Sequence, residues 1–190
     1  LAGAAVAASL ARRGWSVEVL DAAATPAAGA SGLPAGLLAP HHSPDDNLLS
    51  RLSRAGIRCT LQQLEDLLPA GQDWALSGAL EHRPEACVPP FEAAYPASAW
   101  SRAAGASRLA QAGLAPDAPA LWHEKAGWAK PAALVRAWLA QPGVRFLGGR
   151  TVARLQPHPQ GGWQALGSQG ELLASADIAV VAGALGSAAL

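Results

Sequence analysis

The sequence predicts an α/β fold with a Rossmann-like domain that binds a dinucleotide, and three observations lead to this prediction. Residues 2–13 are rich in alanine, as helices are, and Gly14 follows at the position where glycine commonly ends a helix. Residues 16–20 then alternate as in a strand, and the strand ends at Asp21. A helix followed by a strand that ends in an acid is the second half of a dinucleotide-binding βαβ unit.

Gly3 has the place of the third glycine in a G-x-G-x-x-G fingerprint, which lets the helix pack closely against a strand. The first two glycines and the first strand would come before Leu1, and the chain ends just after an apparent buried strand, so we expect the domain to be incomplete at both ends. Asp21 comes 18 residues after Gly3, where an acid that binds ribose hydroxyls is expected. An ordinary αβ unit, in which Asp21 only ends a strand, is the alternative.

The stretch GASGLPAGLLAP, residues 29–40, follows this strand and contains Gly29, Gly32 and Gly36. Glycine allows backbone N–H groups to approach a ligand without interference from a Cβ atom, and such groups form anion sites. We therefore expect a pyrophosphate or the edge of a flavin ring to lie against this loop. A flexible loop is the alternative, but it does not explain the apolar residues LLAP at its end.

A long amphipathic helix is predicted up to Pro69, with Ser43 as its N-cap and Pro44 as its first helical residue. The residues expected to form its buried stripe are Leu48, Leu49, Leu52, Cys59, Leu64 and Leu67. Three arginines at spacings of three and four are expected to share another face: Arg51, Arg54 and Arg58. Such a face is usually solvated, and a stripe that contacts phosphates is the alternative.

Strands and helices alternate in the rest of the chain. The sequence predicts a short strand within residues 73–84, a helix after residue 100, strands within residues 120–130, a helix that opens at residue 131, and further strands from residue 144 onward. The last strand, IAVVA at residues 178–182, is fully apolar, as buried parallel strands are. Gly183 follows it directly, at a carboxyl end where open α/β sheets bind cofactors.

The composition indicates a globular protein with a sizeable core. The 190 residues are 51% hydrophobic and 15% charged, and 14 basic and 14 acidic residues cancel, so overall charge gives no argument for nucleic acid. Cys59 and Cys87 lack a CxxC partner, which favours buried thiols in a reduced, cytoplasmic compartment. The five histidines share no metal-ligand spacing with the cysteines, so no metal site is expected, and no apolar run is long enough to span a membrane.

Aromatic and basic residues gather in the middle of the chain. Trp122, Trp128 and Trp138 are expected to pack in the core, and a pocket for a planar ring is the alternative. The two lysines of the chain, Lys125 and Lys130, are either solvated or face a ligand. Their spacing does not decide between these roles.

Gly3, Gly14, Asp21, the GASGLPAGLLAP loop and the ending DIAVVAGALGS together resemble the D-amino-acid-oxidase-type FAD oxidoreductases. The resemblance implies FAD as the cofactor, with Gly3 near the pyrophosphate and Asp21 on the adenosine ribose. The other positions that it implies around the cofactor are Ala30, Ser31, Gly32, Gly36, Val152 and Gly183. Many members of the family have Glu at the position of Asp21, and either carboxylate can accept from ribose hydroxyls. No catalytic base stands out.

The segments SPDDNLLSRLSR, residues 43–54, and AGWAKP, residues 126–131, resemble a narrower group, the FAD-dependent domains of bifunctional tRNA-modifying enzymes. This resemblance implies oxidation of the C–N bond of a carboxymethylaminomethyl group on the wobble uridine of tRNA. FAD would take the hydride, the imine would hydrolyse, and glyoxylate would leave the aminomethyl nucleoside behind. A methyltransferase domain that uses S-adenosylmethionine would precede this chain in the full-length protein.

The resemblance also implies the domain organisation. An FAD-binding domain would comprise residues 1–70 and 143–190, and residues 71–142 would form part of an inserted α+β substrate domain. The arginines at 51, 54 and 58 are the candidates for contacts with tRNA. The rival functions are an FAD-dependent oxidase or dehydrogenase of a small amino acid such as glycine or sarcosine, an inactive nucleotide-binding fragment, and an NAD-dependent dehydrogenase, which the GASG loop disfavours.

Overall fold

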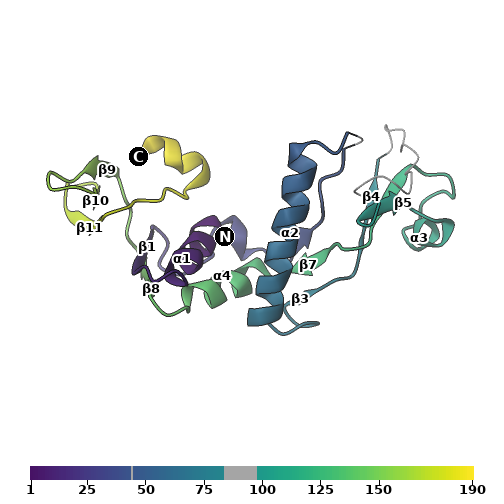
Figure 1. Ribbon diagram of the computed structural model, residues 1–190, viewed down its shortest axis with the longest axis horizontal. Helices are drawn as coiled ribbons and strands as arrows, with labels where there is room; N and C mark the ends of the chain where they lie inside the picture. The colour runs from purple at the N-terminus through teal and green to yellow at the C-terminus, as the bar shows by residue number, and fades with distance from the viewer. Residues whose placement is uncertain (44, 84–97) are drawn as a thin grey trace. The chain divides into compact units, whose positions relative to one another are not determined.

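The computed structural model describes residues 1–43, 45–83 and 98–190, and these form two compact units (Figure 1). Residues 1–34 and 131–190 make the first unit, and residues 35–130 make the second. The units divide at Pro34 and Pro131 rather than at the expected residues 70 and 142. The long helix after residue 47 therefore belongs to the second unit, and the helix that opens at Pro131 belongs to the first.

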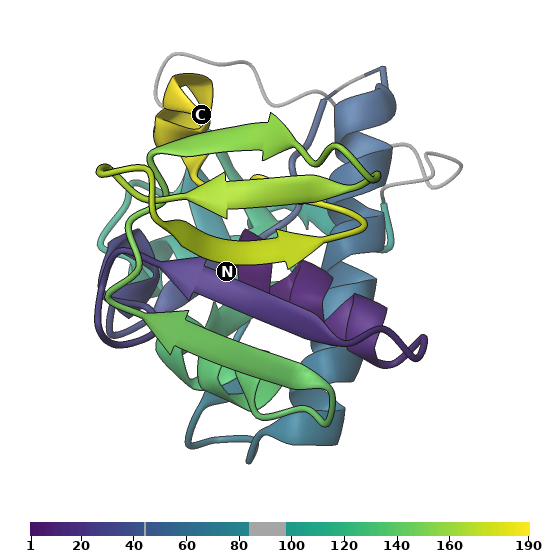
Figure 2. The same ribbon diagram turned by 90° about the vertical axis from the view of Figure 1, so that its left-hand side faces the viewer.

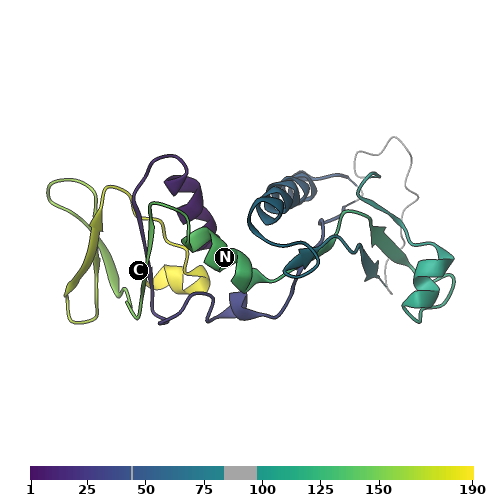
Figure 3. The same ribbon diagram turned by 90° about the horizontal axis from the view of Figure 1, so that it is seen from below.

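The first unit contains a βαβ-like arrangement of two parallel strands with helices packed beside them. Strands β1 (Val17–Asp21) and β8 (Val144–Gly148) pair in parallel from Val17 with Val144 to Asp21 with Gly148 (Figure 2). Helices α1 (Ala2–Ala11) and α4 (Pro131–Leu139) pack side by side (Figures 1 and 3). Gly14 has a φ of 88°, a left-handed conformation that confirms its predicted role in ending α1.

A second, antiparallel sheet completes the regular structure of the first unit. Its strand order is β11-β10-β9, from Arg154–Pro157 (β9), Trp163–Leu166 (β10) and Leu172–Ala176 (β11). Residues 178–182, the predicted buried strand, are not a strand, and Ile178 and Val180 are more than half exposed. This prediction is wrong for the described residues because an apolar run forms a parallel strand only where a neighbouring strand supplies its hydrogen bonds. A short 3₁₀ helix, η2 (Ala184–Ala189), follows.

In residues 35–43, 45–83 and 98–130, the described part of the second unit, there are two small antiparallel sheets and two helices. One sheet has the order β2-β7-β3, from Gly36–Leu38 (β2), Gly127–Ala129 (β7) and Trp74–Ala75 (β3). The other has the order β4-β6-β5, from Ala79–His82 (β4), Ala120–His123 (β6) and Ser101–Ala103 (β5). The helices are α2 (Leu48–Leu67) and α3 (Ala106–Gln111).

Helix α2 begins later and buries a different face than predicted. Asn47 is its N-cap, since its side chain accepts a hydrogen bond from the Ser50 N–H at 3.1 Å, so the prediction of Ser43 as the N-cap is wrong. Pro44 lies outside the described residues. Of the predicted stripe, Leu64 is buried and Leu67 is half-buried, whereas Leu48, Leu49, Leu52 and Cys59 are exposed. The buried face is instead formed by Ser50, Arg54, Ile57 and Leu64.

The tryptophans lie mostly in the cores of the two units. Trp74, Trp100 and Trp122 are buried in the second unit, where Trp128 is half-buried, and Trp138 is buried in the first. This burial confirms core packing for Trp122 and Trp138. Of the three tryptophans singled out in the sequence, Trp122 and Trp128 belong to the second unit and Trp138 belongs to the first.

Candidate dinucleotide-binding site

The carboxyl ends of the two parallel strands in the first unit are held together by the loops that follow them. Asp21 ends β1, and its Oδ1 atom accepts a hydrogen bond from the Ala23 N–H at 2.9 Å. The Asp21 carbonyl accepts from the Arg150 N–H at 2.9 Å, and the Ala23 carbonyl accepts from the Gly149 N–H at 3.0 Å. The Asp21 carboxylate is thus held in one orientation at the strand end, and it remains exposed.

A cavity of about 1080 Å³ in the first unit brings most of the predicted cofactor positions together. The predicted residues that line it are Gly3, Asp21, Ala30, Ser31, Val152 and Gly183. They come from α1, from the end of β1 and its loop, from the segment after β8, and from the segment after residue 182. Two predicted residues are not among its lining residues: Gly32 lies in the adjacent 3₁₀ turn, and Gly36 lies in β2 of the second unit, where it pairs with Ala129.

The loop after β1 folds against the beginning of α1. Residues Ala30–Gly32 form a 3₁₀ turn, η1, in which the Gly32 N–H donates to the Gly29 carbonyl at 2.8 Å. The Leu1 nitrogen donates to Ser31 Oγ at 3.0 Å, so the turn lies beside the first turn of the helix. A Cβ atom on Gly32 would lie 2.6 Å from the Ala27 carbonyl oxygen. The glycine at position 32 is therefore required by the close turn itself.

The groups around this cavity fit the adenosine and pyrophosphate parts of FAD. The first turn of α1 leaves N–H groups without intrahelical partners, and such groups together with the helix dipole attract phosphate. The Asp21 carboxylate can accept hydrogen bonds from ribose hydroxyls. Gly3 adds no bulk at the helix start, where its Cβ position lies 3.4 Å from the Ala182 Cβ atom. Gly3 and Asp21 therefore line one cavity that is large enough for a cofactor.

Sequence reasoning missed one glycine that shapes this site. Gly148 ends β8 opposite Asp21, and a Cβ atom there would lie only 2.3 Å from the Ala24 carbonyl oxygen. The loop that leaves Asp21 can cross the end of β8 because Gly148 has no side chain. The glycine pair in FLGG, at residues 146–149, was the available signal.

Gly148→Ala is expected to lower the free energy of unfolding by about 1–3 kcal/mol, because the added methyl group overlaps the backbone of the crossing loop. The same change should weaken retention of FAD, since the displaced loop begins directly after Asp21 and its Ala23 N–H donates to the Asp21 carboxylate. Hydrogen exchange of peptides over β1 and β8 in the full-length protein measures the first effect. Gly56→Ala is the matched control: nothing lies near its Cβ position in α2, so it should be neutral or stabilising. Slow exchange in both variants would contradict the prediction.

A buried polar cluster lies in the second unit and was not predicted as a group. His123 on β6 is 1% exposed; its Nδ1 atom lies 2.8 Å from Ser101 Oγ, and its Nε2 atom lies 2.9 Å from Glu81 Oε2. Arg83 Nε also donates to Glu81 at 2.8 Å. Partial burial alone would raise the pKa of Glu81, but the hydrogen bonds from Arg83 and His123 outweigh it and leave this pKa below its usual value. These contacts join all three strands of the sheet.

His42 lies close enough to this cluster to be affected by the charges of Arg83 and Glu81. Burial is the largest cause that lowers the pKa of His42 below its usual value, and the positive charge of Arg83 is the next. A neutral imidazole is therefore favoured there. In this cluster the Glu81 side chain is partly exposed, but Ser101 is only 2% exposed, so its hydroxyl is not accessible as a nucleophile. The role of the cluster is therefore to hold the sheet together.

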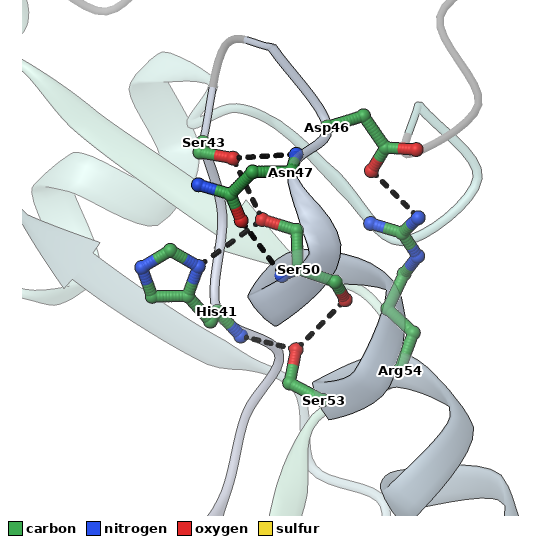
Figure 4. A network of polar contacts seen from close by, with 7 residues as sticks. All are labelled: His41, Ser43, Asp46, Asn47, Ser50, Ser53 and Arg54. Atoms are coloured by element: carbon green, nitrogen blue, oxygen red, sulfur yellow. Dashed lines mark hydrogen bonds and ion pairs between the residues drawn. The ribbon is translucent and has the colours of Figure 1, made fainter.

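The three arginines of α2 do not share a solvated face. Arg51 and Arg58 are exposed, but the Arg54 side chain is only 8% exposed, and its Nη2 atom lies 2.6 Å from Asp46 Oδ1 (Figure 4). The expectation of one common face is therefore wrong for Arg54. Its guanidinium is occupied by the loop before α2 and is not available to a large ligand.

The same loop is held by a network of hydroxyl and imidazole groups, which Figure 4 shows from close by. Ser50 is fully buried, and its Oγ atom lies 2.8 Å from Ser43 Oγ and 3.1 Å from His41 Nδ1. Ser53 Oγ accepts from the His41 N–H at 3.0 Å and donates to the Ser50 carbonyl at 2.9 Å. The residues before α2 are thus tied to its first two turns.

Other expectations concern thiols, metals and membranes. Cys59 is exposed, so the prediction of a buried thiol is wrong for this residue, and Cys87 lies outside the described residues. Within residues 1–43, 45–83 and 98–190, no group of three or more His, Cys, Asp and Glu side chains could hold a metal ion. In the same part of the chain, no helix has both the length and the apolar character needed to cross a membrane.

Comparison with known proteins places this geometry in a family. The profile described as DAO, FAD dependent oxidoreductase, matches residues 1–190. The tRNA 5-methylaminomethyl-2-thiouridine biosynthesis bifunctional protein MnmC of Polaromonas naphthalenivorans is 56% identical over 100% of the chain, and its counterpart in Polaromonas sp. strain JS666 is 54% identical. The chain covers 31% and 30% of these two relatives.

Solved structures show the same fold at lower sequence similarity. A thermally stable mutant of fructosyl peptide oxidase superposes with a TM-score of 0.65 at 16% identity, over 92% of this chain and 45% of that one. The L-amino acid deaminase from Proteus vulgaris gives a TM-score of 0.62 at 18% identity, over 88% of this chain and 42% of that one. Together with the match over all 190 residues, these findings confirm the Rossmann-like fold. The chain belongs to the DAO family of FAD dependent oxidoreductases.

Proposed function

We propose that this chain is part of an enzyme that oxidises the C–N bond of the carboxymethylaminomethyl group on the wobble uridine of tRNA, leaving the aminomethyl nucleoside. The observation that carries the proposal is the 56% identity over the whole chain to a relative named for tRNA 5-methylaminomethyl-2-thiouridine biosynthesis. Solved structures of amino acid and fructosyl peptide enzymes resemble the chain at less than 20% identity, which supports the fold and does not favour their substrates.

The residues of the first unit would hold the cofactor. FAD, when bound, supplies the chemistry by accepting a hydride from the carbon beside the substrate nitrogen. Asp21 would accept hydrogen bonds from the ribose hydroxyls, and the N–H groups of the first turn of α1, at Gly3, would face the pyrophosphate. Ala30 and Ser31 would lie along the flavin side of the cofactor, with Val152 near the adenine and Gly183 beside the ADP portion.

Two other predicted positions would act through the backbone. Gly32 would keep the turn after β1 tight enough to bring Ser31 beside α1, because the Ala27 carbonyl oxygen leaves no room for a side chain at position 32. Gly36 would mark the entry to the second unit. We propose that this unit belongs to the substrate domain, so that the substrate domain comprises residues 35–130 and the cofactor domain residues 1–34 and 131–190.

The whole protein would have further parts. The chain covers about a third of the bifunctional relatives, so we propose that a methyltransferase domain that uses S-adenosylmethionine is linked to it in the full-length protein. We further propose that the enzyme acts in the cytoplasm, where its tRNA substrate is available. Arg51 and Arg58, the exposed arginines of α2, would contribute positive charge toward that substrate.

The test is to measure product release by the purified full-length protein. Glyoxylate should form stoichiometrically with loss of the carboxymethyl group when the substrate is tRNA that carries the carboxymethylaminomethyl nucleoside. Glycine and sarcosine should give turnover at least 100-fold slower at equal concentration. Faster turnover of either small amino acid than of the tRNA would show an amino acid oxidase instead. No turnover with any of them, in protein that contains no flavin, would support a nucleotide-binding fragment without activity.

A further inference from the structure

Two cationic side chains converge on a single buried tryptophan in the second unit. The Arg58 Cζ atom, from α2, lies 5.6 Å from the centroid of the Trp100 ring. The Lys125 Nζ atom, from the turn between β6 and β7, lies 5.1 Å from the same centroid. The two charges are therefore within about 11 Å of each other, although they are 67 residues apart in the sequence.

Backbone hydrogen bonds fix this arrangement. The Glu124 N–H donates to the Trp100 carbonyl at 2.9 Å, so the residue before Lys125 is tied to the residue that carries the indole ring. Trp100 directly precedes β5, which pairs with β6 through Ser101 opposite His123. The register of the sheet therefore places the backbone of Lys125 beside Trp100, whichever rotamer its side chain adopts.

No carboxylate of the described residues neutralises these two charges. Arg58 and Lys125 are both exposed, and neither forms an ion pair within the described ranges. Glu124, the acid next to Lys125, is used elsewhere: it pairs with Arg102 and accepts from Trp122 Nε1 at 3.1 Å. Most other basic residues of this unit have carboxylate partners, with pairs at Arg54, Arg83, Arg102 and Lys130.

The physical chemistry of this pair points to an anionic ligand. The negative face of an indole ring attracts a cation and holds its side chain in place, which offsets part of the repulsion between two like charges. Trp100 is 6% exposed, so it offers no free ring face for a nucleobase to stack on. The surface therefore offers positive charge and little capacity to recognise bases, as is typical of sites that bind backbone phosphates.

We propose that Arg58 and Lys125, held by Trp100, form a phosphate-binding surface that engages the RNA backbone of the substrate. The inference rests on the proposed function for the identity of the RNA and identifies Lys125, from outside α2, as a tRNA contact. Arg58 and Arg54 of α2 therefore have different roles: Arg58 belongs to this surface, whereas Arg54 is bound to Asp46. Contacts of this kind give affinity that depends strongly on salt and weakly on sequence.

The test compares binding of an unmodified tRNA transcript by the full-length wild-type protein and by Arg58→Gln/Lys125→Gln. Gln keeps part of the aliphatic stem and removes the charge. The variant should bind at least 10-fold more weakly at low salt, and the slope of log K against log salt should fall by about 1 to 2, since about 0.7–0.9 is expected for each lost phosphate contact. Turnover of hypomodified tRNA should show a raised KM with little change in kcat.

Arg108→Gln/Arg154→Gln is the matched control. It removes the same charge from two exposed arginines, one of which also lies over an indole ring, with Arg108 Cζ 3.9 Å from the Trp122 centroid. The control should bind tRNA within threefold of the wild-type affinity. Equal losses in the test and control variants, or unchanged binding and salt slope in the test variant, would overturn the proposed surface.

The outcome also separates this inference from the proposed function. If the wild-type protein oxidises hypomodified tRNA but the test variant keeps its affinity, the surface is wrong and the proposed function stands. If the wild-type protein binds the transcript through these residues but does not oxidise hypomodified tRNA, the surface stands as an RNA contact and the proposed reaction is wrong.

Discussion

Asp21→Ala is expected to weaken the binding of FAD by the full-length protein about 10- to 100-fold. The carboxylate lies at the end of β1 and lines the cavity of the first unit, where it can accept hydrogen bonds from ribose hydroxyls. Hydrogen bonds to a charged group are worth roughly 1.5–3 kcal/mol, which corresponds to this loss of affinity. Titration of the deflavinated protein with FAD, followed by flavin fluorescence, measures the effect.

Two further variants separate recognition of ribose from the shape of the loop. Asp21→Asn keeps an oxygen that can accept from the Ala23 N–H, so it should preserve the turn and still lose affinity, because it removes the negative charge. Glu171→Ala removes the same charge from an exposed position of the first unit that does not line the cavity, so it should bind FAD normally. Wild-type affinity in Asp21→Ala, or equal losses in Asp21→Ala and Glu171→Ala, would count against the role of Asp21.

Arg54→Ala is expected to destabilise the second unit by about 3–5 kcal/mol. The side chains of Arg54 and Asp46 are 8% and 16% exposed, and removing one partner of a buried ion pair leaves the other charge without compensation. Asp46 also has a φ of 47°, a conformation that the ion pair helps to retain. Hydrogen exchange of peptides that cover α2 should become faster, and the change should reach the residues joined to its first turns (Figure 4).

The neighbouring arginine provides the control. Arg51→Ala removes an exposed charge three residues earlier and should change stability by no more than about 0.5 kcal/mol. Asp46→Asn in the Arg54→Ala background should recover part of the loss, because Asn removes the buried charge and tolerates a positive φ. Equal hydrogen exchange in Arg54→Ala and Arg51→Ala would mean that Arg54 does not stabilise the unit. Arg54 would then again be a candidate for contact with tRNA.

The local pattern of the first forty residues was predictable because it depends on short-range chemistry. Gly14 ends α1 in a left-handed conformation, and Asp21 ends β1, as the spacing of helix, glycine, strand and acid indicated. Among the six predicted positions that line the cavity, Gly3 and Asp21 followed from this pattern, and the family resemblance added Ala30, Ser31, Val152 and Gly183. Gly148 did not, because its requirement arises from a loop 124 residues earlier in the chain that crosses it, and no local spacing records that contact.

The face of α2 was predicted wrongly because hydrophobicity alone does not decide which side of a helix is covered. Leu48, Leu49 and Leu52 are exposed, while Ser50 and Arg54 are buried by the polar loop that precedes the helix. That loop supplies hydrogen bonds and a carboxylate, so polar side chains can be buried there at little cost. The apolar run at residues 178–182 failed as a strand prediction for a related reason, since its backbone has no strand partner among the described residues.

We propose that this chain contributes the cofactor site of a flavin enzyme whose electron donor is an amine on tRNA. The most direct test is the absorption spectrum of the full-length protein, recorded without oxygen while tRNA bearing the carboxymethylaminomethyl nucleoside is added. We predict loss of the oxidised flavin band in proportion to added tRNA, with glycine and sarcosine leaving the band unchanged. A protein without flavin absorbance that also fails to take up added FAD, or one whose band persists with the tRNA and disappears with a small amino acid, would contradict the account.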